Sequence, residues 1–472
     1  MDFTTINFLA FLIAVTIVCR VCPARFRAAL IALASYTYYC TWSPKAALLL
    51  LAVTVAAFLA ARGIDAIKRD LGRRGMALAA LSGLLALLGV FKLAPFLGSL
   101  LKGPLLVPLG ISYYTFKLIS YVLDVYWQKV PAEKAFFPFA AYVAFFPQIV
   151  AGPIQRSDSF LPQIGKPASW GNVVWGVQRV LLGLFKKFLV ADNLSILVNF
   201  VYSHVHASGT PLVLGMYAYP LQIYADFSGL TDIAIGAAWM LGIESPENFN
   251  APFSAPNPSE FWRRWHITLT TLLTDYVFTP MRMAVRNLGN AGLVLSLFVT
   301  MVLIGLWHGF RWTYAIFGMV HAVYLAVDAL TSRLRTRYYK ANPTAGLLTN
   351  WLGPVITFHL VALAFVFFRG ETVQDALYIL RHLGMGIGTP SADFSKLKQT
   401  EGRAIMFGLG AYVVTEIADY LRRHGRQGQF VSALPPWGRW AVYYCTTVIA
   451  VVYILLMVGT PVNRITFVYA MF

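Results

Sequence analysis

A histidine stands at the end of an apolar run in this chain of 472 residues. The run begins near Gly292 and ends with Trp307, His308 and Gly309. An ionisable side chain in apolar surroundings of membrane type is costly, so His308 is the first candidate for a functional group. With a reference pKa of about 6.5, an imidazole can take up and return a proton near neutral pH. His308 is therefore expected to act as a general base.

A second histidine, His266, ends a segment in which Arg263 and Arg264 lie between two tryptophans. This pattern is typical of an interfacial anchor, because indole rings settle at headgroup level and guanidinium groups meet phosphate. Guanidinium groups also suit two-pronged recognition of a phosphorylated ligand. We expect Ser259 to cap a helix that starts there, on which Trp262 and His266 share a face. For His266 alone, a hydrogen-bonded structural role is the competing interpretation.

Other catalytic patterns do not occur in the sequence. It contains no Gly-x-Ser-x-Gly nucleophile elbow, no His-Glu-x-x-His zinc helix and no phosphate-binding P-loop. His266, His308 and His321 include no pair four residues apart, and the four cysteines form no metal-ligand pattern with nearby histidines. We therefore expect no metal site and no bound cofactor. A histidine acting as a general base is the chemistry that remains.

Composition indicates an integral membrane protein. Hydrophobic residues make up 58% of the chain and charged residues 12%, with a mean hydropathy of +0.64. The net charge of +18 could point to nucleic acid, but the Lys and Arg residues lie in short loops between apolar segments. That arrangement is typical of cytoplasmic loops and of attraction to anionic headgroups. Membrane lipid is thus an expected partner, and nucleic acid is not.

Apolar runs of spanning length recur along the chain. They cover residues 5–19, 28–42, 44–61, 76–91, 104–127, 136–151, 172–200, 211–242, 291–308, 312–331, 349–368, 403–421 and 438–460. A helix needs about 20 mostly apolar residues to cross, and some of these runs are short or paired. We therefore predict an all-α polytopic membrane protein with about eleven transmembrane helices plus re-entrant or interfacial helices. No internal repeat or appended soluble domain is visible, so residues 1–472 are expected to form one membrane-embedded domain.

An apolar segment around Gln148 is interrupted by helix-breaking residues. Pro147, Gly152 and Pro153 make one regular helix unfavourable there. Irregular backbone at membrane depth is tolerated where protein buries it or where it lines a water-filled cavity. The segment 145–165 is therefore either re-entrant or tunnel-lining, or else an ordinary loop at the interface.

Carboxylates interrupt another apolar region. Asp226, Ser228 and Asp232 lie between the apolar stretches 212–223 and 233–243. Carboxylates at this depth are costly unless they are paired or hydrated, so both need partners. Arg or His residues of neighbouring helices are the obvious candidates. Structural ion pairs are one interpretation, and direct contact with substrate or coenzyme is the other.

These segments occur in order with two others. In sequence order the series is Pro108–Phe116, Phe145–Ile154, Asp226–Gly229, Asn248–Asn250, Glu260–His266 and Gly305–Gly309. It resembles the membrane-bound O-acyltransferase family, in particular the bacterial branch that serves alginate O-acetylation and D-alanyl transfer to teichoic acid. The similarity is strong over about residues 85–330. Several motifs in order are far more specific than any one of them.

The resemblance implies a fold and a site. The family's fold is a ring of tilted helices around a central tunnel, in which a cytoplasmic acyl donor meets an acceptor from the other face. The histidine of the family's Trp-His-Gly motif is catalytic, which falls on His308, and His266 is the second polar residue that faces the tunnel. The donor would be acetyl-CoA or an acyl carrier protein thioester. Tentative donor-binding or substrate-binding residues are Arg263, Arg264, Trp262, Trp307, Asp226, Ser228, Asn250, Gln148 and Pro153.

The resemblance also implies a function at the bacterial inner membrane. An acetyl group would cross the membrane to a periplasmic partner protein, which acetylates an exopolysaccharide such as alginate, since no soluble domain here could hold a long glycan. D-alanyl transfer to teichoic acid from a carrier-protein thioester is the alternative within the family. A polytopic transporter or flippase is the alternative from another class, because broken apolar segments and intramembrane carboxylates also occur in secondary transporters. A histidine-rich rather than acid-rich polar cluster counts against transport.

Overall fold

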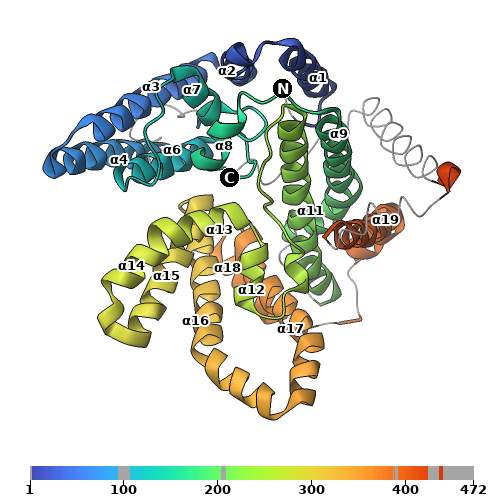
Figure 1. Ribbon diagram of the computed structural model, residues 1–472. Coiled ribbons are helices and arrows are strands. Elements are labelled where there is room, and N and C mark those ends of the chain that lie inside the picture. The colour runs from blue at the N-terminus through green and yellow to red at the C-terminus, as the bar shows by residue number, and fades with distance from the viewer. Residues whose placement is uncertain are drawn as a thin grey trace, which may run out of the picture. The chain divides into compact units, whose positions relative to one another are not determined.

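The computed structural model describes residues 3–93, 107–203, 209–385, 387–388, 392–423 and 435–438 (Figure 1). All regular elements within these ranges are helices, which confirms the predicted all-α class. Apart from Gly438, the predicted apolar run 438–460 lies outside the described residues.

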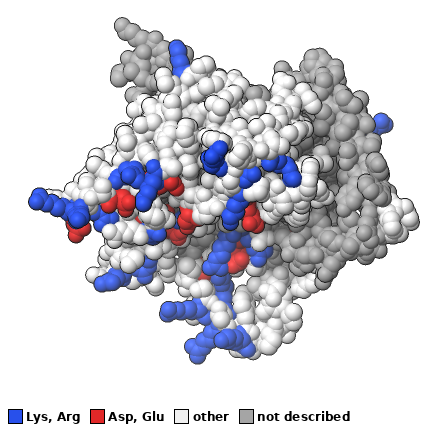
Figure 2. Space-filling model, turned by 45° about the horizontal axis from the view of Figure 1, so that its top comes forward, with Lys and Arg blue, Asp and Glu red and all other residues white. Residues whose placement is uncertain are grey.

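Five of the described helical stretches are long and apolar enough to cross a membrane. They are α3 (Pro44–Ala66), α4 (Asp70–Lys92), the stretch Arg286–His308 that joins η5 (Arg286–Leu288) to α15 (Gly289–His308), α16 (Trp312–Ala341) and α17 (Pro343–Arg369). Each coincides with a predicted run. In α4, only 11% of the most apolar 18-residue stretch is buried within the protein, and Leu71 near its start is 84% exposed. Such a surface needs lipid as its solvent, so the chain is a polytopic membrane protein. Figure 2 shows wide areas without charge between the Lys and Arg side chains of one face.

The described chain divides into two compact units. Unit 1 comprises Met1–Leu182 and Leu230–Glu247, and unit 2 comprises Gly183–Gly229 and Asn248–Phe472. Helices α9 (Trp170–Phe185) and α11 (Thr210–Met240) contribute residues to both units. The single-domain organisation remains a prediction.

Unit 1 holds the irregular segment. Its further helices are α1 (Ile6–Val21), α2 (Ala24–Cys40), α6 (Ile111–Tyr126), α7 (Phe136–Ala144), α8 (Ser157–Phe160) and η1 (Leu161–Gln163). After α7 the backbone is not helical from Phe145 to Arg156, as the prolines and the glycine predict. The amide Nε2 of Gln148 lies 2.8 Å from Gln155 Oε1 and 2.8 Å from Ser245 Oγ. Buried side-chain hydrogen bonds thus stabilise this irregular backbone.

A buried lysine and a buried arginine make further polar contacts in unit 1. Lys117 of α6 donates to Gln148 Oε1 at 2.9 Å. Arg179 of α9 donates to Asp232 at 2.6 Å and binds both carboxylate oxygens of Glu247 at 2.8 and 2.6 Å. The predicted arginine partner for Asp232 is therefore confirmed. These contacts have the form of structural ion pairs.

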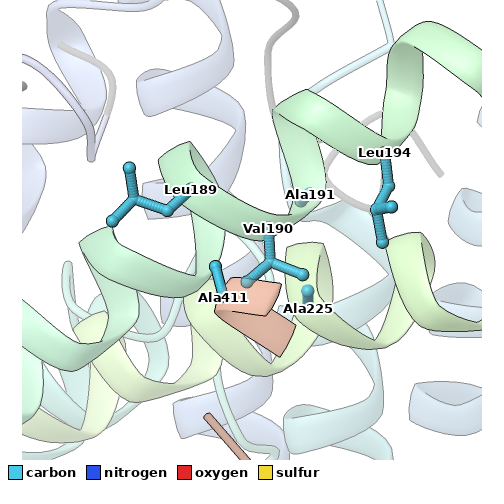
Figure 3. Close-up of a cluster of buried hydrophobic side chains, with 6 residues drawn as sticks. All are labelled: Leu189, Val190, Ala191, Leu194, Ala225 and Ala411. Carbon is cyan, nitrogen blue, oxygen red and sulfur yellow. The ribbon is translucent and has the colours of Figure 1, made fainter. Parts of the chain in front are cut away.

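Unit 2 carries both candidate histidines. Its remaining elements are η2 (Lys186–Ala191), α10 (Asp192–Ser203), η3 (Pro252–Ser254), α12 (Pro258–Arg264), α13 (Ile267–Leu273), η4 (Thr274–Phe278), α14 (Thr279–Ala284), α18 (Val373–His382) and α19 (Ala392–Arg423). The first of them, η2, is one turn of π-helix, which is wider than an α-helical turn. Figure 3 shows the cluster in which its residues 189–191 and Leu194 of α10 pack against Ala225 of α11 and Ala411 of α19. Small side chains on the two partner helices allow this close packing.

The wide turn η2 also forms two buried ion pairs. Lys187 lies 2.9 Å from Asp226 of α11 and 3.0 Å from Asp192, and its own side chain is 2% exposed. Lys186 lies 2.8 Å from Asp419 of α19. Asp226 is thus paired, as a carboxylate at this depth requires. Its partner is a lysine rather than the expected arginine or histidine, because the wide turn directs two consecutive lysines into the protein.

Candidate functional site

One small cavity in unit 2 brings the two histidines together. Its lining consists of aromatic and aliphatic residues and two imidazoles: Ile223, Trp262, Trp265, His266, Leu269, Ile304, His308, Phe317, Phe365 and Phe368. The cavity volume is about 10 Å³, which is the scale of a single water molecule. His266 is 1% exposed and His308 is 8% exposed. Two imidazoles therefore share an enclosed, largely apolar space.

A tight helical hairpin positions His308, the last residue of α15. The backbones of α15 and α16 approach closely at two glycines. A Cβ atom on Gly305 would lie 2.1 Å from the carbonyl oxygen of Tyr314, and one on Gly318 would lie 2.4 Å from that of Met301. The imidazole of His308 packs edge-on against Phe368 of α17, with 4.8 Å between ring centroids. Helix packing and aromatic contacts together define where this ring lies.

The backbone around His266 differs from the expected helix. Helix α12 ends at Arg264, and His266 has φ +45°, in the left-handed region, at the start of α13. The N-cap of α12 is Asn257, whose side chain accepts a hydrogen bond from the backbone N–H of Glu260 at 2.8 Å. The prediction of Ser259 as the cap is therefore wrong, and the Ser259 hydroxyl binds Asp328 instead.

Trp262 and His266 reach the same cavity by another route. They do not share one helical face, because the chain turns between α12 and α13. Both nevertheless line the cavity. The indole Nε1 of Trp262 donates to Nδ1 of the buried His321 at 3.2 Å, which holds the indole in the cavity wall.

The side chain of Asn248 lies within hydrogen-bonding distance of the His266 imidazole. Its Oδ1 lies 3.1 Å from His266 Nδ1 and accepts from the backbone N–H and the hydroxyl of Thr268 at 3.2 and 2.9 Å. Burial lowers the pKa of His266 to about 3, so its imidazole is neutral at neutral pH. Sequence reasoning named the segment Asn248–Asn250 but selected Asn250, whose side chain is exposed. Alternation along an extended segment would place both asparagines on one face, so the sequence pattern does not distinguish the buried Asn248 from the exposed Asn250.

The remaining candidates from the sequence lie in four places, the first two of which are beside His266 and at the surface. Trp307 packs against His266, with 5.6 Å between ring centroids. Arg263 is 73% exposed in its side chain and pairs with Glu260 at 2.6 Å, and the Arg264 side chain is 29% exposed. These arginines reach the surface rather than the cavity.

Two candidates lie on α11, and two lie in unit 1. Asp226 and Ser228 are buried and flank Phe227, whose ring centroid is 4.7 Å from that of His266. Gln148 and Pro153 belong to the irregular segment of unit 1. The structure therefore groups Trp262, Trp307 and the two histidines.

The chemistry available in the cavity is proton transfer by imidazole. None of the described residues that line it is a carboxylate, a lysine or an arginine. Among the described residues, no three His, Cys, Asp or Glu side chains are grouped as metal ligands, and Cys445 lies outside those residues. Aromatic walls exclude bulk water, which favours transfer of an acyl group to a hydroxyl over hydrolysis.

Known proteins with similar sequences are named as an acetylase, an acetyltransferase and a D-alanyltransferase. The chain is 36% identical over 372 residues to the probable alginate O-acetylase AlgI of Pseudomonas aeruginosa, covering 75% of this chain and 68% of that protein. It is 31% identical to the peptidoglycan O-acetyltransferase of Helicobacter pylori, with 74% and 72% covered. It is 32% identical to the teichoic acid D-alanyltransferase of Bacillus subtilis, with 56% and 69% covered.

A family match covers the same part of the chain as both histidines. The sequence profile of the membrane-bound O-acyltransferase family matches residues 134–367. This range contains the irregular segment, α11, the loop that carries His266, and the hairpin that carries His308. The chain belongs to the membrane-bound O-acyltransferase family.

Proposed function

We propose that this O-acyltransferase moves an acetyl group from a cytoplasmic thioester across the bacterial inner membrane, for O-acetylation of an exopolysaccharide. The observation that carries the proposal is the pair His266 and His308 in one buried, aromatic-lined cavity. About eleven membrane spans in a ring around a tunnel would let the donor and the acceptor reach this cavity from opposite faces. Because the chain belongs to an O-acyltransferase family, acyl transfer is favoured over the transporter alternative.

The proposed reaction needs one base. A thioester is already activated, so the protein has to position it, exclude water and deprotonate the acceptor hydroxyl. His308 takes the hydroxyl proton while the hydroxyl oxygen attacks the thioester carbonyl carbon. The carbon–sulfur bond then breaks, and the thiolate receives the proton from the imidazolium. In a covalent variant, the imidazole of His308 first accepts the acyl group and then passes it on.

His266 has a supporting role in this proposal. It either polarises the thioester carbonyl or orients the acceptor. Trp262 and Trp307 form the walls around the two imidazoles. Asp226, Ser228, Asn250, Gln148 and Pro153 remain tentative contacts of donor or substrate.

The donor is proposed to be acetyl-CoA. Arg263 and Arg264 carry guanidinium groups that reach the surface beside the cavity-lining Trp262 and Trp265. They could bind the phosphates of coenzyme A in a two-pronged manner. An acyl carrier protein thioester is the second candidate donor, since an acidic carrier surface would also suit the basic loops.

The acceptor is proposed to be a periplasmic partner protein that acetylates alginate or a similar exopolysaccharide. Support comes from the similarity to an alginate O-acetylase. Two other relatives act on peptidoglycan and teichoic acid according to their names, so D-alanyl transfer from a carrier-protein thioester is the alternative.

The test uses purified protein in liposomes with acetyl-CoA labelled in the acetyl group. The parent is expected to release free thiol and to transfer label to an added hydroxyl acceptor, and His308→Ala is expected to lose transfer by at least about 100-fold. His359→Ala is the matched control, because His359 is an exposed histidine of α17 whose ring hydrogen-bonds to its own helix at Val355 and packs against Tyr217 of α11 outside the cavity lining. Equal transfer by His308→Ala and the parent would refute the role of His308.

A further inference from the structure

We propose that Asn248 is a positioning residue that fixes which nitrogen of His266 carries the proton, so that His266 orients the acceptor by accepting a hydrogen bond at Nε2. The inference rests on the proposed acyl transfer and decides between the two roles given above for His266. It is carried by the hydrogen bonds around one oxygen atom, Asn248 Oδ1.

The backbone of Thr268 identifies that atom as the amide oxygen. A backbone N–H can only donate, and the N–H of Thr268 points at the Asn248 side chain at 3.2 Å. The atom it meets must therefore be the carbonyl oxygen and not the NH2 group. The hydroxyl of Thr268, at 2.9 Å, donates to the same oxygen. Two donors from one neighbouring residue thus fix the orientation of the amide.

The orientation of the amide decides the protonation of His266. Nδ1 lies 3.1 Å from an oxygen that can only accept, so Nδ1 carries the proton. A neutral imidazole has one N–H, and burial keeps this imidazole neutral by lowering its pKa to about 3. Nε2 therefore presents a lone pair.

Backbone hydrogen bonds hold the two residues in place. The N–H of Ile267 donates to the carbonyl oxygen of Asn248 at 2.9 Å, and the N–H of Asn250 donates to that of Arg264 at 3.0 Å. This short pairing stabilises the left-handed conformation of His266, which is otherwise unfavourable for a residue with a Cβ atom. Functional residues are often held in such conformations by their surroundings.

Two aromatic side chains also hold the ring of His266. It packs edge-on against Phe227 of α11, with 4.7 Å between ring centroids, and against Trp307 of α15. Among the described residues lining the cavity, from α11 to α17, His308 is the other ionisable group. Asp226 next to Phe227 is ion-paired with Lys187. No carboxylate of the described lining therefore competes with Asn248 for the proton on Nδ1.

This protonation state excludes one of the two roles. Polarising a thioester carbonyl needs a hydrogen-bond donor, and Nε2 without a proton cannot donate. It can accept a hydrogen bond from a hydroxyl of the acceptor and so hold that molecule while the reacting hydroxyl faces His308. Asn248 acts through His266 and does not itself need to touch the substrate.

The first test reads the protonation state directly and needs no catalysis. The protein is labelled with ¹⁵N in its histidine side chains, placed in detergent micelles, and its ring nitrogens are observed by two-bond proton–nitrogen correlation NMR. His266→Gln identifies the His266 signals. The parent is expected to show protonated Nδ1 and bare Nε2 at pH 7, and Asn248→Ala is expected to lose this preference. A protonated Nε2 in the parent would overturn the proposal.

The second test separates positioning from folding. Asn248→Asp keeps the shape and all three accepted hydrogen bonds but adds a negative charge next to Nδ1–H, which should raise the pKa of His266 by roughly 1 to 3 units. Acetyl transfer should then fall on acidification at pH values where the parent is unaffected. Asn290→Asp, the same change at an exposed position in α15, should leave the pH profile unchanged.

The outcomes of the two tests are distinguishable. Asn248→Ala should lower transfer roughly 10- to 100-fold by freeing the ring. A uniform loss at all pH values in Asn248→Asp would indicate a merely structural role and would refute positioning through the proton. Absent transfer in the parent, with Nδ1 protonated, would overturn the proposed function and leave the protonation assignment intact.

Discussion

Replacing Gly305 with alanine tests whether the closely packed hairpin of α15 and α16 positions His308. The new Cβ atom would lie 2.1 Å from the carbonyl oxygen of Tyr314, whereas Cβ contacts below 3.0 Å are essentially never found. The obstacle is backbone, so no side-chain rotation relieves it. The two helices must separate by about 1 Å, and His308 lies one helical turn beyond the substitution.

The expected cost of this separation has two parts. Overpacking of a well-packed contact lowers stability by about 1 to 3 kcal/mol. A displacement of about 1 Å in a reacting group can lower the rate about 100-fold. The fall in the rate of acetyl transfer should thus be larger than the fraction of unfolded protein could explain. We expect Gly305→Ala to remain folded in detergent at 20 °C while its acetyl transfer from labelled acetyl-CoA falls roughly 100-fold.

Gly410→Ala provides the matched control. Gly410 is an exposed helical glycine of α19, and a Cβ atom there meets nothing within 4 Å. Alanine favours a helix over glycine by about 1 kcal/mol, so this variant should unfold at the same or a higher temperature with unchanged activity. Full activity of Gly305→Ala, with an unchanged unfolding temperature, would refute the argument that close backbone contact sets the place of His308.

Three further predictions concern charge. Lys187→Met leaves Asp226 buried without its cation and should cost about 3 to 5 kcal/mol in thermal unfolding, whereas Lys129→Met, at a lysine that is 52% exposed, should cost less than about 1 kcal/mol; equal costs would contradict the ion-pair assignment. Arg263→Ala should raise KM for acetyl-CoA several-fold and leave kcat unchanged, and a loss in kcat alone would contradict phosphate binding. The pKa of His266 is about 3 in the folded protein against about 6.5 unfolded, so the unfolded state binds the extra proton and stability falls as pH drops from 6.5 towards 3. His266→Gln should therefore flatten the dependence of the free energy of unfolding on pH, by up to about 1.4 kcal/mol per pH unit, and an unchanged slope would contradict the depressed pKa.

The helices could largely be predicted because they follow from hydropathy. Five predicted apolar runs coincide with helices of spanning length, and the break after α7 follows from Pro147, Gly152 and Pro153. The sequence also contains a signal for the start of α12. Asn257 precedes Pro258, and proline favours the first helical position, so this pair outweighs Ser259 as the cap.

The geometry of the site could not be predicted in the same way. His266 and His308 are named by motifs, but the cavity they share depends on the left-handed turn at His266 and on the glycine contact between α15 and α16. Tertiary packing decides both. Likewise, Asn248 and Asn250 are identical in type, and only the fold shows that Asn248 contacts the imidazole.

The wide turn η2 has a consequence for changes in chain length. A π-helical turn holds about one residue more than an α-helical turn. Deleting one residue between Lys186 and Ala191 would convert it to an ordinary α-helical turn, and the residues of α10 would keep roughly their orientation, because the wide turn already holds the extra residue. The ordinary turn would no longer direct two consecutive lysines into the protein, so Lys186 or Lys187 would lose its carboxylate. A single-residue deletion in η2 should therefore weaken the buried charge pairing and leave the flanking helices in register, whereas the same deletion within α10 would rotate the residues beyond it by about 100°.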